Sequence, residues 1–206
     1  AIFHRFMRGD FSGVFLLSVG LVLLTAMEIF GQTAAPISFT NWETPPVHPI
    51  ALSPDARTLA VCNLPDSRLE IFDVSSDPIR PLGSVQVGLD PVTVRFRTPT
   101  EVWVVNHISD SISVVDLTSR QITATLDTLD SPEDVVFAGS PPRAFVSCAL
   151  PSQVQVFDPV TRESLRTIPI DGDRPRAMAV SPGGHKVYVA ILESGNASTI
   201  LAPSLT

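Results

Sequence analysis

The sequence predicts an all-β fold, a β-propeller of four-stranded antiparallel blades, because three columns of residues recur with one period. The first column is a proline that recurs at intervals of 42, 41 and 43 residues, at Pro49, Pro91, Pro132 and Pro175. The second is an aspartate that follows an apolar pair, at Asp73, Asp116 and Asp158. The third is an apolar run at 59–63, 102–106, 144–148 and 187–191. A period of about 42 residues with four short strands is typical of a propeller blade.

The second repeat shows the four expected strands most clearly. They are the β-branched-rich runs at 92–96, 101–106, 111–116 and 121–127, separated by turn clusters of Asn, Asp and Ser. Such runs bounded by turn residues indicate antiparallel strands joined by hairpins. One four-stranded sheet cannot bury both of its faces, so the blades must stack on one another. A β-sandwich also has short strands, but it does not require so regular a period.

The blades are expected at about 47–88, 89–129, 130–171 and 172–206, with the last one incomplete. Propellers usually need four to eight blades to close their ring. We therefore expect the chain to be a piece of a longer propeller. Its total blade number and any fused domain are not specified by these residues.

The first 34 residues are expected to be a secretory signal peptide. An apolar run at 13–27 follows Arg5 and Arg8 and is followed by small residues. A basic start, a short apolar core and a small-residue exit are the signature of such a signal. An uncleaved membrane anchor is the alternative, although anchors need about 20 apolar residues. We expect an exported protein, placed in the periplasm, at the cell surface or outside the cell.

Residues 35–46 are expected to link this segment to the first blade. Within them, residues 37–42 form a short apolar and polar run that we interpret as a ring-closing strand. Many propellers close by pairing an N-terminal strand with the last blade. A membrane contact is expected only through the N-terminal segment, if that segment stays uncleaved.

The charge balance disfavours nucleic-acid binding, and the sequence lacks the common haem, zinc and nucleophile motifs. Acidic residues outnumber basic ones 21 to 14, for a net charge of −7, and Lys186 is the single lysine. Without a basic stripe, nucleic-acid binding is disfavoured. The sequence has no Cys-x-x-Cys-His, His-Glu-x-x-His or Gly-x-Ser-x-Gly motif. We therefore expect no cofactor, metal or catalytic residue in this segment, and we interpret Cys62 and Cys148 as small buried hydrophobes within strands.

Several of these segments resemble the YVTN β-propeller repeat. The resemblance rests on residues 102–106 (VWVVN) and 111–116 (SISVVD), on residues 53–56 (SPDA), and on residues 181–184 and 187–190 (SPGG, VYVA). It covers roughly residues 46–190. Blade three departs from it with Cys148 where the family has Asn, and blade two has RTPT at 97–100 in place of the family's Ser-Pro-Asp-Gly turn. The resemblance implies an exported or surface protein of bacteria or archaea, of a kind that also occurs beside cytochrome and lactonase activities.

Propeller geometry predicts where a ligand would bind. The loop that leads into the first strand of a blade and the loop between its second and third strands should emerge on one face, at the mouth of the channel. This is an analogy from the fold. The varied polar residues on that face are the candidate binding residues: His48, Asp90, Asn106, His107, Glu133, Asp134, Arg174 and Arg176.

A structural interpretation competes with the binding one at these positions. Loop-end residues are often only solvated, and Asp90 and Asp110 favour tight turns through their own backbones. Asp73, Asp116 and Asp158 recur at one place in the first three blades, which favours a structural hydrogen bond to the following turn; blade four has Leu201 there.

Three functions remain open from the sequence. The first is an exported, non-enzymatic scaffold that binds a protein, a glycan or a surface partner. The second is the propeller part of a redox protein associated with a cytochrome or a quinone. The third is a hydrolase or lactonase with a metal in the channel, for which Asp90, Asn106, Glu133 and Asp134 offer oxygen ligands. We rank them in this order because the sequence shows regular blades and no catalytic motif.

Overall fold

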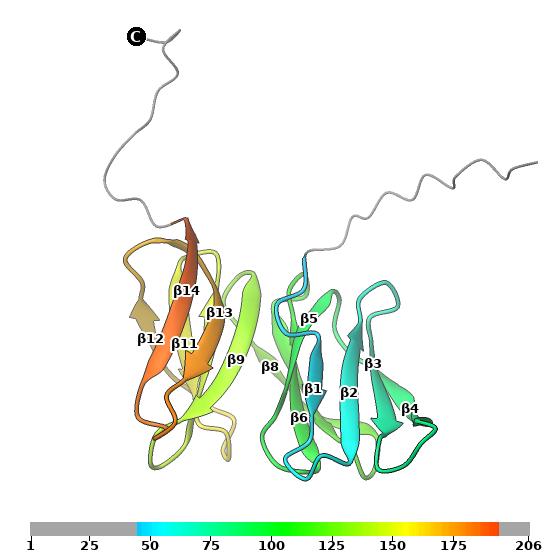
Figure 1. The fold of residues 1–206 in the computed structure, drawn as a ribbon. Helices are drawn as coiled ribbons and strands as arrows, with labels where there is room; N and C mark the ends of the chain where they lie inside the picture. Colours follow the sequence, from blue (N-terminus) through cyan, green and yellow to red (C-terminus); the bar gives the residue numbers. More distant parts are fainter. Residues whose placement is uncertain (1–44, 194–206) are drawn as a thin grey trace, which may run out of the picture. The chain divides into compact units, whose positions relative to one another are not determined.

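The computed structural model describes residues 45–193, and every regular element within them is a β-strand (Figure 1). Blade one contains β1 (Ile50–Leu52), β2 (Thr58–Asn63), β3 (Arg68–Asp73) and β4 (Arg80–Gln86). Blade two contains β5 (Pro91–Phe96), β6 (Glu101–Asn106), β7 (Ser111–Asp116) and β8 (Gln121–Asp127). Blade three contains β9 (Pro132–Ala138), β10 (Arg143–Cys148), β11 (Gln153–Phe157) and β12 (Ser164–Pro169), and blade four contains β13 (Asp173–Val180) and β14 (Val187–Glu193).

Each blade is an antiparallel meander whose strands pair in sequence order. The predicted all-β propeller architecture is therefore confirmed, as three four-stranded blades and a two-stranded fourth. In blade two, the predicted strands at 101–106, 111–116 and 121–127 match β6, β7 and β8, and β5 starts one residue earlier than predicted. The predicted signal peptide and the proposed ring-closing strand at 37–42 lie outside the described residues.

The blades pack face to face, which explains why the central strands are apolar along their whole length. In β6, Val102 and Val104 join a buried cluster with Ala60 and Leu69 of blade one. Trp103, on the opposite face of the same strand, joins the buried cluster that blade two shares with blade three. Since successive side chains of a strand point to opposite faces, a blade with a neighbour on each side needs apolar residues at every position.

The interface between blades three and four is smaller. Its buried residues are Val136, Val154 and Met178, with partly buried Val187 and Val189 packed against them. The outer strands β4, β8 and β12 are mostly exposed. The core therefore lies between the inner strands of neighbouring blades.

Left-handed backbone conformations recur at fixed places in the repeat. They occur just before the third strand of a blade, with φ of 52°, 46° and 61°, and just before the repeat proline, with φ of 57°, 55° and 58°. The residues are Ser67, Asp110 and Ser152 in the first set, and Asp90, Ser131 and Arg174 in the second. Asp and Ser are among the residues that enter this conformation most readily in turns. Asp90 and Asp110 lie in such turns, as predicted, but their carboxylates do not bond those turns: Asp90 has no side-chain hydrogen bond among the described residues, and Asp110 Oδ1 accepts from the N–H of Ser131 at 2.8 Å.

Arginines at one turn position join the outer rims of successive blades. Arg120, before β8, donates to the carbonyl of Leu82 in blade one. Arg162 occupies the corresponding turn of blade three and donates to the carbonyl and hydroxyl oxygens of Thr123 in blade two, at 2.9 and 3.0 Å. Blades two and three are thus each tied at the outer edge to the blade before them.

The strand-end aspartates have the structural role that their recurrence predicts. Asp116 Oδ1 accepts hydrogen bonds from the backbone N–H and the hydroxyl of Ser119 at 2.7 and 2.9 Å. Asp158 Oδ1 accepts from the N–H groups of Val160 and Thr161 at 2.8 and 3.1 Å. Asp73 bonds Ser75 in the same way and pairs with Arg80. These turn bonds lower the pKa of all three carboxyl groups.

We expect the Asp73 turn to weaken in acid. Its bonds to Ser75, and then to Arg80, lower its pKa to about 2, against about 3.9 in an unfolded chain. A group whose pKa is lower in the folded state stabilises the protein above its unfolded pKa, and that stability is lost as the pH falls. In urea unfolding, the Asp73→Asn variant should be less stable than the parent at pH 7 and nearly equal to it at pH 2. A difference that stays constant across this range would contradict the assignment.

The two cysteines are buried and unpaired, as predicted for small apolar strand residues. Burial raises the pKa of the Cys148 thiol to about 12 and raises that of Cys62 as well. Both thiols are therefore poor nucleophiles at neutral pH. Within residues 45–193 no helix has the length and apolar character needed to cross a membrane.

Candidate functional site

The predicted loop face exists in the structure. In blades two and three, the loop into the first strand bonds to the hairpin between the second and third strands of the same blade. His107 N–H donates to the Asp90 carbonyl and Ala149 N–H to the Ser131 carbonyl, both at 2.9 Å. On the opposite face, Leu117 N–H donates to the Thr100 carbonyl at 2.8 Å. The two sets of loops therefore emerge at opposite ends of the strands, and most of the candidate residues belong to the first set.

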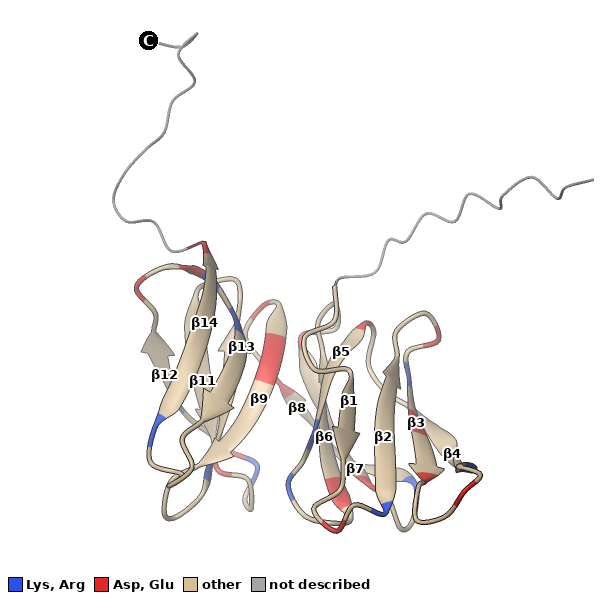
Figure 2. Ribbon diagram, in the orientation of Figure 1, with Lys and Arg blue, Asp and Glu red and all other residues tan. Residues whose placement is uncertain are grey.

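In blades two, three and four, a bulge after the repeat proline redirects the inner strand. In β9 the pairing with β10 shifts between Pro132 and Asp134, so Glu133 has no partner in the ladder. Similar shifts occur after Pro91 in β5 and after Pro175 in β13. Bulges bend a strand and change the direction of a side chain. The two adjacent acidic residues of β9 (Figure 2) consequently enter different groups of contacts.

Asp134 is the centre of a buried polar clamp. Its carboxylate accepts hydrogen bonds from Arg95 Nε and Nη2 at 3.2 and 3.1 Å, and from the backbone N–H groups of Val135 and Met178 at 2.8 and 2.7 Å. The side chain of Asp134 is completely buried, and His48 Nδ1 lies 3.1 Å from its Oδ2. The clamp joins all four blades, since these partners come from the start of blade one and from β5, β9 and β13.

His48 is held as a neutral imidazole at neutral pH. Burial lowers its pKa, and the guanidinium of Arg95 acts in the same direction, which outweighs the opposing effect of Asp134. Its Nδ1 also lies 2.8 Å from Arg95 Nη2. Because the Asp134 carboxylate, the Arg95 guanidinium and the His48 imidazole are engaged with one another, the clamp holds blades together.

Glu133 belongs to a second group, which reaches the loop face. Its Oε1 lies 3.8 Å from His107 Nδ1, and its Oε2 lies 3.4 Å from Arg176 Nη2. The Arg176 contact is close enough for an ion pair but lacks hydrogen-bond geometry, and Glu133 Oε2 is buried without a hydrogen bond. The three residues come from three successive blades. We call Glu133, His107 and Arg176 the mouth cluster.

Burial raises the pKa of Glu133, and the nearby Asp90 carboxylate adds to this effect, while Arg176 and His107 oppose it. A group whose folded pKa is raised stabilises the protein below its unfolded pKa, about 4.3 for Glu, and loses this contribution as the pH rises. The charge of Glu133 therefore works against folding at neutral pH.

We accordingly expect the Glu133→Gln variant to be at least as stable as the parent at pH 7, and to show no advantage at pH 4. The matched control is Glu101→Gln, which should lose stability at pH 7. Glu101 Oε1 accepts from Trp103 Nε1 and Arg97 Nη1 at 3.0 and 2.9 Å, and bonds to a charged acceptor are the stronger ones. Urea unfolding measures both variants, and a clear loss of stability in Glu133→Gln at pH 7 would contradict the prediction.

Asp90 lies beside the mouth cluster. Its backbone forms a turn, and its carboxyl group is buried. Only 5% of its surface is exposed, and neither carboxylate oxygen has a hydrogen-bond partner among the described residues. The positions that correspond to Asp90 in blades three and four hold Ser131 and Arg174. The repeat therefore does not require an acid at this place.

The other predicted residues have different surroundings. Asn106 is fully buried, and its amide donates to the hydroxyls of Ser111 and Ser113 at 3.2 and 3.0 Å. It therefore lies inside blade two, beneath the loop face. Arg174 is well exposed and lies 3.7 Å from Glu193. The predicted residues thus fall into two groups. His48 lies with Asp134, and His107 lies with Glu133 and Arg176. Arg174 belongs to neither group.

Three residues that join these groups were not predicted. Arg95 is the next-to-last residue of β5, Thr93 donates its hydroxyl to the Glu133 carbonyl at 2.8 Å, and Ser147 donates to the Arg176 carbonyl at 2.6 Å. The predicted residues were chosen next to loops, at or near strand starts and hairpins. The charge of Arg95 within the otherwise apolar run PVTVRF was the signal that could have identified it.

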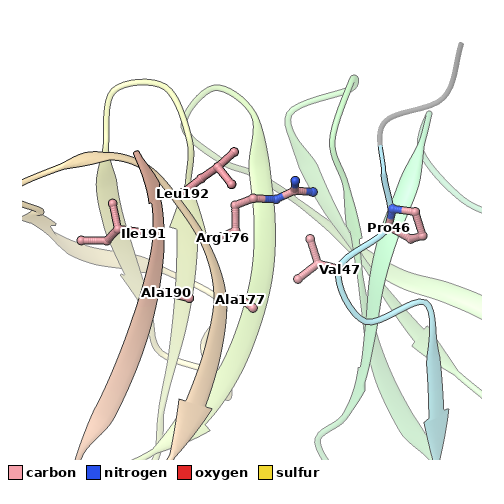
Figure 3. Close-up of a pocket in the computed structure, with 7 residues that line it drawn as sticks. All are labelled: Pro46, Val47, Arg176, Ala177, Ala190, Ile191 and Leu192. Atoms are coloured by element: carbon pink, nitrogen blue, oxygen red, sulfur yellow. The ribbon is translucent and has the colours of Figure 1, made fainter. Parts of the chain in front are cut away.

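Two hollows adjoin these groups. One, of about 460 Å³, is lined by His48, Arg95 and Met178 together with apolar residues of β9 and β13. The other, of about 320 Å³, lies between Pro46 and Val47 and the strands of blade four, and Arg176 extends across it (Figure 3). Arg176 Nη2 donates to the Pro45 carbonyl at 2.7 Å. Both hollows are largely apolar with a cationic side chain at one side.

The groups of the mouth cluster can make polar contacts with a partner. Among residues 45–193, no three His, Cys, Asp or Glu side chains come together as a metal-binding group. The mouth cluster offers a guanidinium, an imidazole and a carboxylate at the end of the sheets, and such groups recognise polar partners by hydrogen bonds and ion pairs.

The fold and these loops define a β-propeller-type repeat protein, and comparison with known proteins supports this class. The chain is similar to a solved structure described as hydrazine synthase of Kuenenia stuttgartiensis, with 26% sequence identity and a TM-score of 0.67. The alignment covers 79% of this chain and 47% of that chain, so this chain matches about half the length of that protein. In all, 874 solved chains match, so the fold alone does not identify a function.

No protein-family profile matches the chain. A search of curated proteins also finds no match.

Proposed function

We propose that the chain is an exported binding module of the YVTN-repeat type, which engages a protein or a surface glycan through its loop face. The observation that carries this proposal is the mouth cluster, in which His107, Glu133 and Arg176 from three blades meet at one end of the sheets. Corresponding positions elsewhere show that the repeat does not need these charges. Glu133 and Arg176 follow the repeat proline, where blades one and two have Ile50 and Val92.

The mouth cluster suits recognition because its pairing is incomplete. Glu133 Oε2 and both Asp90 carboxylate oxygens lack hydrogen bonds within the described part of the chain. Buried polar groups without partners are costly, so this end of the sheets carries acidic charge that the described part of the chain does not fully pair. The Asp134 carboxylate, by contrast, already accepts four hydrogen bonds within the clamp and lies next to Glu133 in β9.

Photo-crosslinking in the producing cells tests the binding face. The probe p-benzoylphenylalanine replaces Ile108, an exposed residue of the β6–β7 hairpin beside His107, and in a matched control it replaces Val160, in the β11–β12 turn of the opposite face. We expect one defined crosslinked product from position 108 and none from position 160. That product should be lost in the Arg176→Ala background.

A glycan partner is tested separately, because it would give no protein adduct. Binding of the purified protein to a glycan array should be lost in Arg176→Ala and kept in Arg174→Ala, the exposed arginine two residues away. Equal products from positions 108 and 160, together with no array signal, would contradict a binding role for the loop face.

The second candidate is the propeller part of a redox protein, and the similarity to hydrazine synthase favours it. A covalently attached c-type haem would have to be bound outside this sequence or by another chain, since the sequence lacks Cys-x-x-Cys-His. Absorbance spectra and metal analysis of the protein purified from its own cells distinguish the two candidates. A stoichiometric haem or quinone that copurifies would favour the redox role, and its absence would favour the binding module.

A further inference from the structure

The loop face carries three large apolar side chains that are exposed to solvent among the described residues. Leu89 lies in the connection from β4 to β5, Ile108 in the β6–β7 hairpin and Leu150 in the β10–β11 hairpin. They are 56%, 59% and 53% exposed. We call these three residues the apolar trio. Exposed apolar residues that gather at one place, with polar residues around them, are typical of an interaction site.

Hydrogen bonds hold the loops of the apolar trio together. The N–H of Ile108 donates to the Leu89 carbonyl at 3.3 Å. Towards blade three, Asp110 Oδ1 accepts from the N–H of Ser131 at 2.8 Å, and the Ser131 carbonyl accepts from the N–H of Ala149 in the β10–β11 hairpin at 2.9 Å. Blades two and three each pack between two described blades, so these loops are placed by residues 45–193 alone.

The opposite end of the sheets has no comparable group among the described residues. The large apolar residues that are exposed in its loops are Ile79 in blade one and Val160 in blade three. Blade two lies between them, so they do not share neighbouring loops. The apolar trio is therefore a property of one end of the sheets.

Charge also distinguishes the two ends of the sheets (Figure 2). The described loops of the loop face contain five aspartates and no Lys or Arg, whereas the loops of the opposite end contain five basic and four acidic residues. The five aspartates are Asp66, Asp90, Asp110, Asp130 and Asp171. The basic residues of the opposite loops are Arg57, Arg97, Arg120, Arg162 and Lys186.

The negative charge of the loop face is only partly paired within the described residues. Both Asp90 carboxylate oxygens and Glu133 Oε2 are buried and accept no hydrogen bond there, and each of these residues is 5% exposed. The cation of the mouth cluster, Arg176, is already engaged with Glu133 and with the Pro45 carbonyl. The exposed aspartates of these loops are Asp66, Asp130 and Asp171. Acidic groups gathered at one surface attract a partner of opposite charge.

We propose that the partner of the loop face is a protein with a basic amphipathic surface, whose apolar side chains pack on the apolar trio and whose Lys or Arg side chains face the surrounding aspartates. This inference rests on the proposed function, because it names the chemistry of the partner that the loop face binds. An apolar centre with a polar rim is the usual anatomy of an interface, and complementary charge speeds association and rejects wrong partners. A neutral glycan offers neither large apolar side chains nor cations.

Two synthetic peptides of opposite charge test this chemistry on the whole chain. Both have the leucine spacing of an amphipathic helix, and the polar positions hold Lys in one and Glu in the other. Fluorescence anisotropy should show micromolar binding of the Lys peptide and none of the Glu peptide. An increase in salt from about 0.05 to about 0.5 M should weaken binding about tenfold, because salt screens exposed charges. No binding of the Lys peptide, or equal binding of the two peptides, would overturn the inference.

Matched variants locate the contact. Asp130→Lys and Glu163→Lys change the net charge equally, but Glu163 is exposed in the β11–β12 turn of the opposite end. The first should weaken binding of the Lys peptide about tenfold and the second less than about twofold. Ile108→Ser should weaken it about tenfold through lost apolar burial, and Val160→Ser should leave it unchanged. Circular dichroism checks that all four variants remain folded. Equal effects within either pair would contradict the proposed contact.

Photo-crosslinking from position 108 separates this inference from the proposed function. In a lysate of the producing cells, the crosslinked product should decrease with added salt and in the Asp130→Lys background, and it should persist in the Glu163→Lys background. A product that forms but responds to neither salt nor Asp130→Lys would leave binding at the loop face standing and overturn the basic partner. If no product forms from position 108, the protein partner on which this inference rests is overturned.

Discussion

Replacement of Asp134 by alanine should destabilise the protein by about 3–5 kcal/mol, the usual cost of removing one partner of a buried ion pair. The change leaves the guanidinium of Arg95 without its carboxylate and the N–H groups of Val135 and Met178 without an acceptor. For a chain of this size, such a loss lowers the melting temperature by roughly 10 °C. Calorimetry or urea unfolding measures the effect.

The control for Asp134→Ala is Arg174→Ala, which breaks the exposed pair with Glu193. Exposed ion pairs contribute about 0–1 kcal/mol, so this variant should unfold close to the parent. The clamp would be contradicted if Asp134→Ala and Arg174→Ala behaved alike. Arg95→Ala should reproduce most of the Asp134→Ala effect, because the two side chains share their hydrogen bonds.

Replacement of Trp103 by alanine should cost about 3–5 kcal/mol, the range for deletion of a buried aromatic side chain. Trp103 is completely buried between blades two and three, and its ring meets that of Phe137 edge to face with centroids 5.3 Å apart. The deletion leaves a cavity at the interface and removes the hydrogen bond from Trp103 Nε1 to Glu101 Oε1. The loss should be visible as a fall in the urea midpoint.

Trp103→Phe separates the contribution of ring burial from that of the Nε1 hydrogen bond. It keeps most of the ring and loses the Nε1 bond, so we expect it to lie between the parent and Trp103→Ala. Ile108→Ala, at an exposed position of the adjoining hairpin, is the control for a surface apolar truncation and should change stability by no more than about 0.5 kcal/mol. A Trp103→Ala variant as stable as Ile108→Ala would contradict the packing described for the interface.

The fold could be predicted from the sequence because strand propensity, turn residues and the repeat period all indicate the same four-stranded blade. The β-branched runs of blade two, the turn residues between them and the repeat proline all specify one meander, and β6, β7 and β8 have the predicted bounds. The strand-end aspartates were predictable for the same reason, since a residue that recurs at a fixed place bonds the same neighbouring turn in each blade.

The candidate site was predictable only in part. Sequence position placed His107, Glu133 and Arg176 on one face, because loop ends follow from strand bounds. It did not separate Glu133 from Asp134, since a bulge after Pro132 changes the direction of the inner strand and sends the two carboxylates to different partners. Arg95 was missed because its role depends on contacts with residues 39 and 47 positions away along the chain.

The hydrogen bonds of Arg120 and Arg162 between the outer strands of neighbouring blades affect the order in which the blades unfold locally. Arg120 and Arg162 each bind a blade to its predecessor, so blade two is tied on both sides while blade four, as described, has only a small interface with blade three. In repeat proteins, stability is a sum of unit and nearest-neighbour contributions. Amide hydrogen exchange should therefore be graded along the chain, with the slowest amides in β6 and β7 and the fastest among the strands in β13 and β14. Proteases that cut transiently opened segments would enter through blade four and leave the first three blades as the resistant core.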